Sequence, residues 1–121
     1  MGFKSEGGGS FSVVTHGGAL INASGISAGQ NVVVWRAPFA CTVQNIRGYR
    51  VAGTGATINA RRNGASNHLA AALSLTSADT YLDGGAVQNT AYIAGDVLEV
   101  MIVTVAGSPT TVMIQVDLSV P

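Results

Sequence analysis

Residues 31–64 read NVVVWRAPFACTVQNIRGYRVAGTGATINARRNG, and this stretch decides the fold class that the sequence predicts. Many of its apolar side chains recur at every second position, which is typical of β-strands and not of helices. Residues 56–61 alternate between apolar and polar side chains, and Asn63-Gly64 then supplies residues that accept the positive φ of a tight hairpin turn. The stretch therefore predicts a β-framework, and nothing in it resembles an active site.

Two local patterns in the same stretch predict where its strands end or bend. Residues 32–35 form a continuous apolar run, as expected of a strand covered on both faces, and Pro38 ends that strand because it has no N–H to donate to a ladder. Val43 and Ile46 are out of phase with each other by one residue, which predicts a β-bulge near residues 44–45.

Turn residues divide the flanking regions into further segments. We expect additional strands over residues 11–15, 19–26, 97–105 and 111–120. Gly17-Gly18 predicts a turn between the first two, and residues 107–109 predict that the last two strands form a hairpin. Residues 67–75 favour irregular structure, and residues 76–89 favour a long surface loop with a short strand around Tyr81.

The number and spacing of these segments predict the fold class. About eight strands without a convincing long helix indicate an all-β protein, an antiparallel β-sandwich of jelly-roll type, with a small closed barrel as the alternative. The length of 121 residues suits one domain, which we place at residues 11–121. Residues 1–10 end in GGGS and are predicted to form a flexible arm, either free or lying on a neighbouring subunit.

The composition indicates an assembling protein with few charges. Charged residues make up 10% of the chain, against about 25% in an ordinary soluble protein. A surface with so few charges is weakly solvated, so permanent contacts between subunits are expected. The net charge of zero removes the electrostatic basis of non-specific nucleic-acid binding. No apolar segment has the length that a bilayer requires and no signal peptide is evident, so we expect no membrane partner and synthesis in the cytoplasm.

The charged residues are unevenly distributed along the chain. Five of the six basic residues come early: Arg36, Arg47, Arg50, Arg61 and Arg62. Five of the six acidic residues come later: Asp79, Asp83, Asp96, Glu99 and Asp117. Two interpretations are open, pairing of these charges within one subunit and complementary charge across a subunit interface. The second interpretation makes all five arginines candidate interface residues.

Aromatic side chains are the other candidates for an interface. Trp35 is explained most simply by core packing, and it is also counted among the candidate interface residues. For Tyr49, Tyr81 and Tyr92 three roles are open: contact with another subunit, packing at the rim of the core, and stacking on a sugar. Of these, Tyr81 and Tyr92 join the candidate interface residues.

No constellation of residues predicts catalysis or a cofactor. His16 and His68 stand at no diagnostic spacing from a serine, and the sequence has no Gly-x-Ser-x-Gly elbow and no phosphate-binding glycine motif. Asp79 and Asp83 are close enough in sequence to share a calcium ion, but the alternating acids of a calcium loop are missing. Cys41, the single cysteine, is expected to be a small buried side chain. We therefore expect a protein that is not an enzyme and that holds no cofactor or metal.

Three short motifs carry a resemblance to a known group of proteins. They are WRAPF at residues 35–39, NARRNG at residues 59–64 and AGDV at residues 94–97. With these motifs in this order, residues 25–120 resemble the small β-sandwich proteins encoded in the genomes of tailed bacteriophages, which are virion accessory proteins. The resemblance implies a capsid decoration or cement subunit, or the base of a head fibre, commonly as a homotrimer. It implies no catalytic residues.

The residues and the resemblance together lead to two hypotheses. The first is a non-enzymatic structural protein of the virion, made in the host cytoplasm, that decorates or cements the capsid through contacts between β-sandwich subunits. Its expected partners are the major capsid protein or other virion proteins and further copies of itself in a homotrimer, with no nucleic acid and no membrane. The alternative is a tail or fibre domain that binds a host-surface glycan through Tyr81, Tyr92 and nearby loops.

Overall fold

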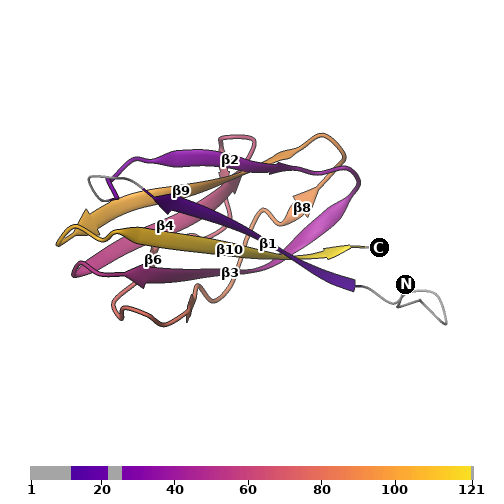
Figure 1. The fold of residues 1–121 in the computed structure, drawn as a ribbon. Coiled ribbons are helices and arrows are strands. Elements are labelled where there is room, and N and C mark those ends of the chain that lie inside the picture. Colours follow the sequence, from indigo (N-terminus) through magenta and orange to yellow (C-terminus); the bar gives the residue numbers. More distant parts are fainter. Residues whose placement is uncertain (1–11, 22–25, 121) are drawn as a thin grey trace.

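The computed structural model describes residues 12–21 and 26–120, with the side chains of residues 26–119. In these residues the chain forms strands and turns but no helix, and hence no helix that is long and apolar enough to cross a membrane. Two antiparallel sheets lie face to face as a β-sandwich (Figure 1). The arm predicted at residues 1–10 lies outside the described residues.

Each sheet contains three long strands and two short ones. The first sheet has the order β1 (Ser12–Ile21), β10 (Thr111–Val120), β3 (Cys41–Val51), with the short strands β7 (Leu82–Asp83) and β8 (Ala91–Tyr92) both paired to β3. The second has the order β2 (Asn31–Arg36), β9 (Val97–Ala106), β4 (Gly55–Arg62), with β5 (Ser66–Asn67) and β6 (Leu73–Ser74) both paired to β4. Strands β1 to β4 thus alternate between the sheets, and β9 and β10 return between them. This order is that of a jelly roll, which confirms the predicted fold class.

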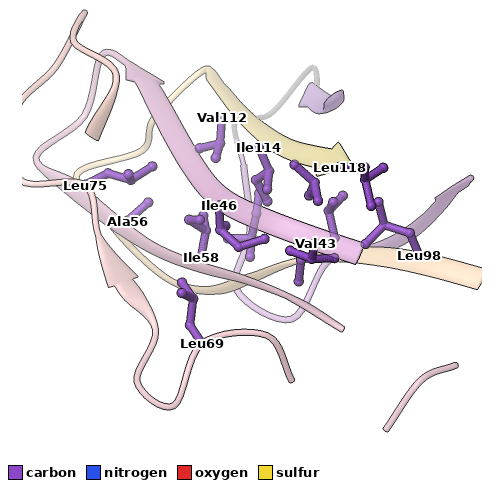
Figure 2. Close-up of a cluster of buried hydrophobic side chains, with 14 of the residues drawn as sticks. Val43, Ile46, Ala56, Ile58, Leu69, Leu75, Leu98, Val112, Ile114 and Leu118 are labelled. Atoms are coloured by element: carbon purple, nitrogen blue, oxygen red, sulfur yellow. The ribbon is translucent and has the colours of Figure 1, made fainter. Parts of the chain in front are cut away.

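The core lies between the two sheets and is built from their inward-facing side chains. Strand β10 alternates as predicted, since four of its apolar side chains are fully buried: Val112, Ile114, Val116 and Leu118. The opposite sheet contributes residues such as Ile58 on β4 and Leu98 on β9, which are equally buried. Figure 2 shows side chains from both sheets meeting in one cluster. Each fully buried side chain of this size stabilises the fold by about 1.5–3 kcal/mol, so the interleaved sheets hold each other in place.

The predicted β-bulge is present in β3. Asp117 is paired with Asn45, whereas the next residue of β10, Leu118, is paired with Val43, so Gln44 is the extra residue. The bulge allows Val43 and Ile46, which an uninterrupted strand would place on opposite faces, both to enter the core.

The predicted hairpin at Asn63-Gly64 is also confirmed. Asn63 has φ 55° and Gly64 has φ 71°, as a turn of this length requires, and β5 then pairs with the end of β4. Residues 67–75 are irregular, as expected, apart from Asn67 at the end of β5 and the two residues of β6. The Asn59 side chain replaces a neighbouring strand at this point, because its amide donates to Leu69 O at 3.0 Å and accepts from Leu69 N at 3.1 Å.

The turn predicted at Gly17-Gly18 is wrong. These glycines lie inside β1, which pairs with β10 without interruption from Ser12 to Ile21, so residues 19–21 continue that strand and do not begin a separate one. Residues 22–25 of the predicted second strand lie outside the described residues. Glycine is disfavoured within strands but is not excluded from them. Ten consecutive pairs with a long central strand outweigh that local preference.

The hairpin predicted between the last two strands is wrong as well. Strand β9 pairs with β2 and β4, whereas β10 pairs with β1 and β3, so residues 107–110 cross from one sheet to the other. Both strands have one buried face, and an apolar pattern of this kind does not specify which sheet contains the strand.

The apolar run at the start of the opening stretch is not covered on both faces. Strand β2 stands at the end of its sheet, where Val33 is 58% exposed and Val32 is 37% exposed. The pattern was typical of a central strand, but burial depends on neighbours that come from distant parts of the sequence.

Candidate functional site

One end of the sandwich gathers all three motifs that carried the resemblance. Three turns meet there, at residues 37–40 after β2, 63–65 after β4 and 93–96 before β9, and we call this region the three-turn end. Ala37 N donates to Asp96 O at 2.8 Å, and Gly95 N donates to Ala37 O at 2.8 Å. The first and third turns therefore pair through their backbones.

The side chains of Asn63 and Asp96 close the rest of the three-turn end. Asn63 N donates to Val97 O and Val97 N donates to the Asn63 side-chain oxygen, each at 2.9 Å. The Asp96 carboxylate accepts from the Asn63 amide and from Ile93 N, also at 2.9 Å each. These two hydrogen bonds, the one from Asn63 first, lower the pKa of Asp96 below its usual value. The ionised carboxylate thus ties two turns together.

This tightly bonded end presents exposed apolar side chains beside a cation. Phe39 is 47% exposed and Ile93 is 67% exposed, while Arg36 at the end of β2 is also exposed. Within the described residues the Arg36 side chain forms no hydrogen bond or ion pair. Aromatic and arginine side chains on a rigid support are typical of surfaces that bind another macromolecule.

A buried hydrogen-bonded cluster lies behind the three-turn end. His68 and Tyr92 are 0% and 2% exposed, and Nε2 of His68 lies 2.8 Å from the Tyr92 hydroxyl. Nδ1 lies 3.2 Å from Gln88 O, and a carbonyl only accepts, so we assign the imidazole proton to Nδ1. Burial lowers the pKa of His68 and raises the pKa of Tyr92, so both side chains are neutral near pH 7. The imidazole therefore ties the β7–β8 loop to the irregular segment after β5.

Three of the predicted interface residues take part in internal contacts around this cluster. Arg62 donates to Asn89 O and to Ala91 O at 2.7 Å each, and its guanidinium carbon lies 5.9 Å from the centre of the Tyr92 ring. The Trp35 ring lies 6.3 Å from the Tyr92 ring, centre to centre. Sequence reasoning missed the contribution of His68, because no local pattern links it to a tyrosine 24 positions away.

Two other arginines of the predicted interface form ion pairs within the subunit. Arg47 lies 3.2 Å from Asp117 and 3.6 Å from Asp83, and Arg61 pairs with Glu99. For these two side chains the structure supports the interpretation in which early bases pair with late acids in one subunit. An exposed pair such as Arg47–Asp83, with side chains 38% and 50% exposed, contributes only about 0–1 kcal/mol to stability.

Arg50 is buried, and its guanidinium hydrogen-bonds to backbone carbonyls. Its side chain is on the inward face of β3 and only 3% exposed, and its guanidinium donates to the carbonyls of Leu75 at 2.9 Å, Ala52 at 2.6 Å and Gly53 at 2.9 Å. A partner subunit has no access to it in this conformation. The three carbonyls belong to two separate connections, so Arg50 fastens them to each other.

The end of the sandwich opposite the three-turn end contains Tyr81 and Asp79. Residues 52–54, 76–81 and 107–110 lie there, and we call this region the Asp79 end (Figure 1). Asp79 N donates to Arg50 O at 2.8 Å. Tyr81 is 48% exposed and packs against Tyr49 with 4.9 Å between ring centres. Of the predicted interface residues, Arg36 and Tyr81 are therefore the exposed ones, and they occupy opposite ends.

The residues considered for metal or thiol chemistry are engaged elsewhere. Asp83 accepts hydrogen bonds from Asn45 and from Gly85 N, which lower its pKa, and it does not join Asp79 in a cluster. Among the described residues no three side chains of the metal-binding types come together. Cys41 is 6% exposed and burial raises the pKa of its thiol, which confirms the expected small buried side chain.

Comparison with known proteins shows a likeness of fold to a phage capsid structure. No protein-family model matches the chain, and no curated protein matches it either. Among solved structures, a chain of the cyanophage Pam1 capsid asymmetric unit is similar over 100% of this chain and 93% of that chain, with a TM-score of 0.59 and 15% sequence identity. At this identity the likeness shows the fold alone. Because both chains are covered almost completely, the two have similar lengths.

Proposed function

We propose that this protein is a non-enzymatic structural component of a bacteriophage virion that decorates or cements the capsid. The observation that supports this most strongly is the likeness to a whole chain of a phage capsid asymmetric unit. The similar lengths make the comparison one between small subunits, and not between this chain and a domain of a larger shell protein. Because a fold does not by itself define a function, the proposal also needs support from the surface.

The surface supports an assembly role. Charged residues are only 10% of the chain, and most of those described bond within the subunit, so little charge is left to solvate the exterior. Exposed Phe39 and Ile93 stand on a backbone that several hydrogen bonds hold in place. Such a surface has a low entropic cost of binding. We propose that it contacts other virion proteins and that the protein forms a homotrimer, with residues 1–10 as an arm on a neighbouring copy.

The test is to locate the protein in particles and to remove it. Electron microscopy of purified phage particles is expected to show it on the outside of the capsid in many copies at equivalent positions. Particles that lack it are expected to release DNA at lower temperature than complete particles, with their protein shell otherwise intact. Its absence from purified virions would contradict the proposal, and so would a location confined to the tail.

One observation favours glycan binding as a second candidate function. Tyr81 and Tyr49 form a partly exposed aromatic pair, and sugars stack on such rings. Tyr92 is buried and is therefore not available for the stacking that the sequence suggested. Binding on a glycan array that disappears in Tyr81→Ala but persists in Phe39→Ala would support this candidate. Absence of any glycan signal would remove it.

A further inference from the structure

The two ends of the sandwich present complementary groups, and we propose that copies of this chain associate head to tail, with the three-turn end of one copy against the Asp79 end of the next. The inference rests on the homo-oligomer in the proposed function and names the contact within it. It does not depend on where in a virion that oligomer is placed. The central pair in the contact is Arg36 of one copy with Asp79 of the other.

Among the charged side chains of the described residues, only Arg36 and Asp79 have no bonding partner within the subunit. Eight charged side chains have a hydrogen bond or ion pair within the subunit: Arg47, Arg50, Arg61, Arg62, Asp83, Asp96, Glu99 and Asp117. Of the charged side chains that the structure describes, Arg36 and Asp79 have neither. Arg36 and Asp79 have opposite charges, so the two ends of the sandwich are electrostatically complementary.

The two groups are too far apart to pair within one copy. Arg36 precedes the start of β3, whereas Asp79 N bonds to Arg50 O near the other end of that strand. An extended strand of 11 residues spans about 35 Å. Figure 1 shows the bend between β2 and β3 at one end of the sandwich and the chain after β6 at the other. The charges are therefore satisfied only by another molecule or by solvent.

Apolar side chains accompany the charge at both ends. Phe39 and Ile93 belong to the loops next to Arg36, and Tyr81 follows Asp79 by two residues. The remaining large apolar side chains that are exposed in the described residues lie on the strands of one sheet: Val32, Val33 and Val103. An aromatic residue beside a charge at each end matches the composition of protein interfaces, in which burial of apolar area provides the affinity and charge sets the register.

Both ends are held rigidly before any contact forms. At the three-turn end Asp96 joins the loops that contain Phe39 and Ile93, and at the other end Asp79 is bonded through its backbone to Arg50. Association therefore requires little additional ordering of these loops, and its entropic cost is low. A contact between two different surfaces is heterologous, so it produces a closed ring where the rotation permits and a filament where it does not.

Charge reversal tests the contact. We expect the purified wild-type protein to self-associate in analytical ultracentrifugation. Arg36→Asp and Asp79→Arg are each expected to weaken this association by roughly tenfold or more, because like charges then face each other. The double variant that exchanges the two charges restores the pair and is expected to recover association. Asp79→Asn removes the charge with a residue that tolerates the φ of 58° at this position, so its weaker association does not reflect backbone strain.

Substitutions at Ala86 provide the control. Ala86→Asp and Ala86→Arg place a charge on an exposed loop away from both ends, and they should leave association unchanged. A wild-type protein that stays monomeric, single variants that associate normally, or a double variant as weak as the singles would each overturn the proposal. So would single variants that lose only their attachment to phage particles, since the partner would then be another virion protein. Detection of the wild-type protein on the capsid tests the proposed function separately.

Discussion

The two ends of this sandwich are closed by side chains of opposite charge. At the three-turn end the Asp96 carboxylate accepts from Ile93 N and from the Asn63 amide. At the Asp79 end the Arg50 guanidinium instead donates to backbone carbonyls. Each turn leaves different backbone groups without a partner in the sheets, and buried groups of this kind require one. The charge needed at an end of the sandwich therefore depends on whether N–H or C=O groups remain without a partner there.

The two closures also differ in burial, which decides their energetic weight. Arg50 is 3% exposed and its hydrogen bond to Leu75 O is buried, so water cannot replace the guanidinium as a donor to that carbonyl. Asp96 is partly exposed, and water can bond to the groups that it releases. A buried group left without its hydrogen bond is more costly than an exposed one. Disruption of the Asp79 end should therefore destabilise the protein more than disruption of the three-turn end.

The largest effect is expected from Arg50→Met. The substitution keeps much of the side-chain length but removes the donors to three carbonyls, and it should lower the free energy of unfolding by about 3 kcal/mol. Urea denaturation followed by tryptophan fluorescence measures this change. Arg47→Met is the matched control, because the half-exposed ion pairs of Arg47 are expected to contribute only about 0–1 kcal/mol. Equal losses in the two variants would show that the burial of Arg50 does not give its hydrogen bonds a greater energetic weight.

A pH-dependent effect is expected from His68 behind the three-turn end. Burial lowers its pKa in the folded state below 6.5, so the unfolded chain binds the proton more readily. Its contribution to stability is complete above pH 6.5 and declines as the pH falls toward the folded pKa, by up to about 1.4 kcal/mol per pH unit. Denaturation at a series of pH values measures this slope. His68→Gln should remove the slope and His16→Gln should retain it. Persistence of the slope without His68 would assign it to another group.

A smaller, local effect is expected from Asp96→Ala. The amide hydrogen of Ile93 loses its acceptor and should exchange with solvent faster, as measured by NMR. The pKa of Asp96 is lowered in the folded state, so its contribution to stability is present above the ordinary aspartate pKa of 3.8 and is lost as the pH falls through the folded pKa. Asp79→Asn is the control, since the Asp79 carboxylate accepts no hydrogen bond within the described residues and asparagine tolerates the φ of 58° there. Unchanged exchange at Ile93 would show that Asp96 does not hold this turn.

The smallest effect on stability is expected from Phe39→Ser. This side chain is 47% exposed, so the free energy of unfolding should change by no more than about 0.5 kcal/mol. Sedimentation should nevertheless show weaker association, because the side chain belongs to the proposed contact. Val33→Ser, on the exposed part of β2, provides the comparison and should leave association intact. Equal loss in both variants would indicate a contact along the sheet and not at its end.

Local chemistry in the sequence was sufficient for several elements. The alternation in β10, the hairpin at Asn63-Gly64 and the bulge at Gln44 all follow from patterns within a few residues. The three motifs behind the resemblance are also local turn chemistry. That the three motifs meet at one end was not predictable from the sequence. Ala37, Asn63 and Asp96 come together only because distant strands pair in the folded structure.

For the candidate interface residues, the sequence specified the residue type but did not predict whether each side chain is exposed or buried. Arg36 and Arg50 have the same charge and lie on strands that follow each other in the sequence, yet one is exposed at an end and the other is buried with its guanidinium bonded to carbonyls. Tyr81 and Tyr92 differ in the same way. The difference comes from which distant segment covers each side chain, and a single sequence contains no local record of that.

By itself, the sequence determined the all-β class, the hairpin turn at Asn63-Gly64 and which side chains of β10 alternate toward a core, because backbone sterics and hydrophobic periodicity act over neighbouring residues. The tertiary structure alone decided that β9 and β10 belong to different sheets, that β1 continues through Gly17-Gly18, and that His68 meets Tyr92. These outcomes depend on pairing and packing between residues far apart in the chain, where the burial of complete faces outweighs local preference.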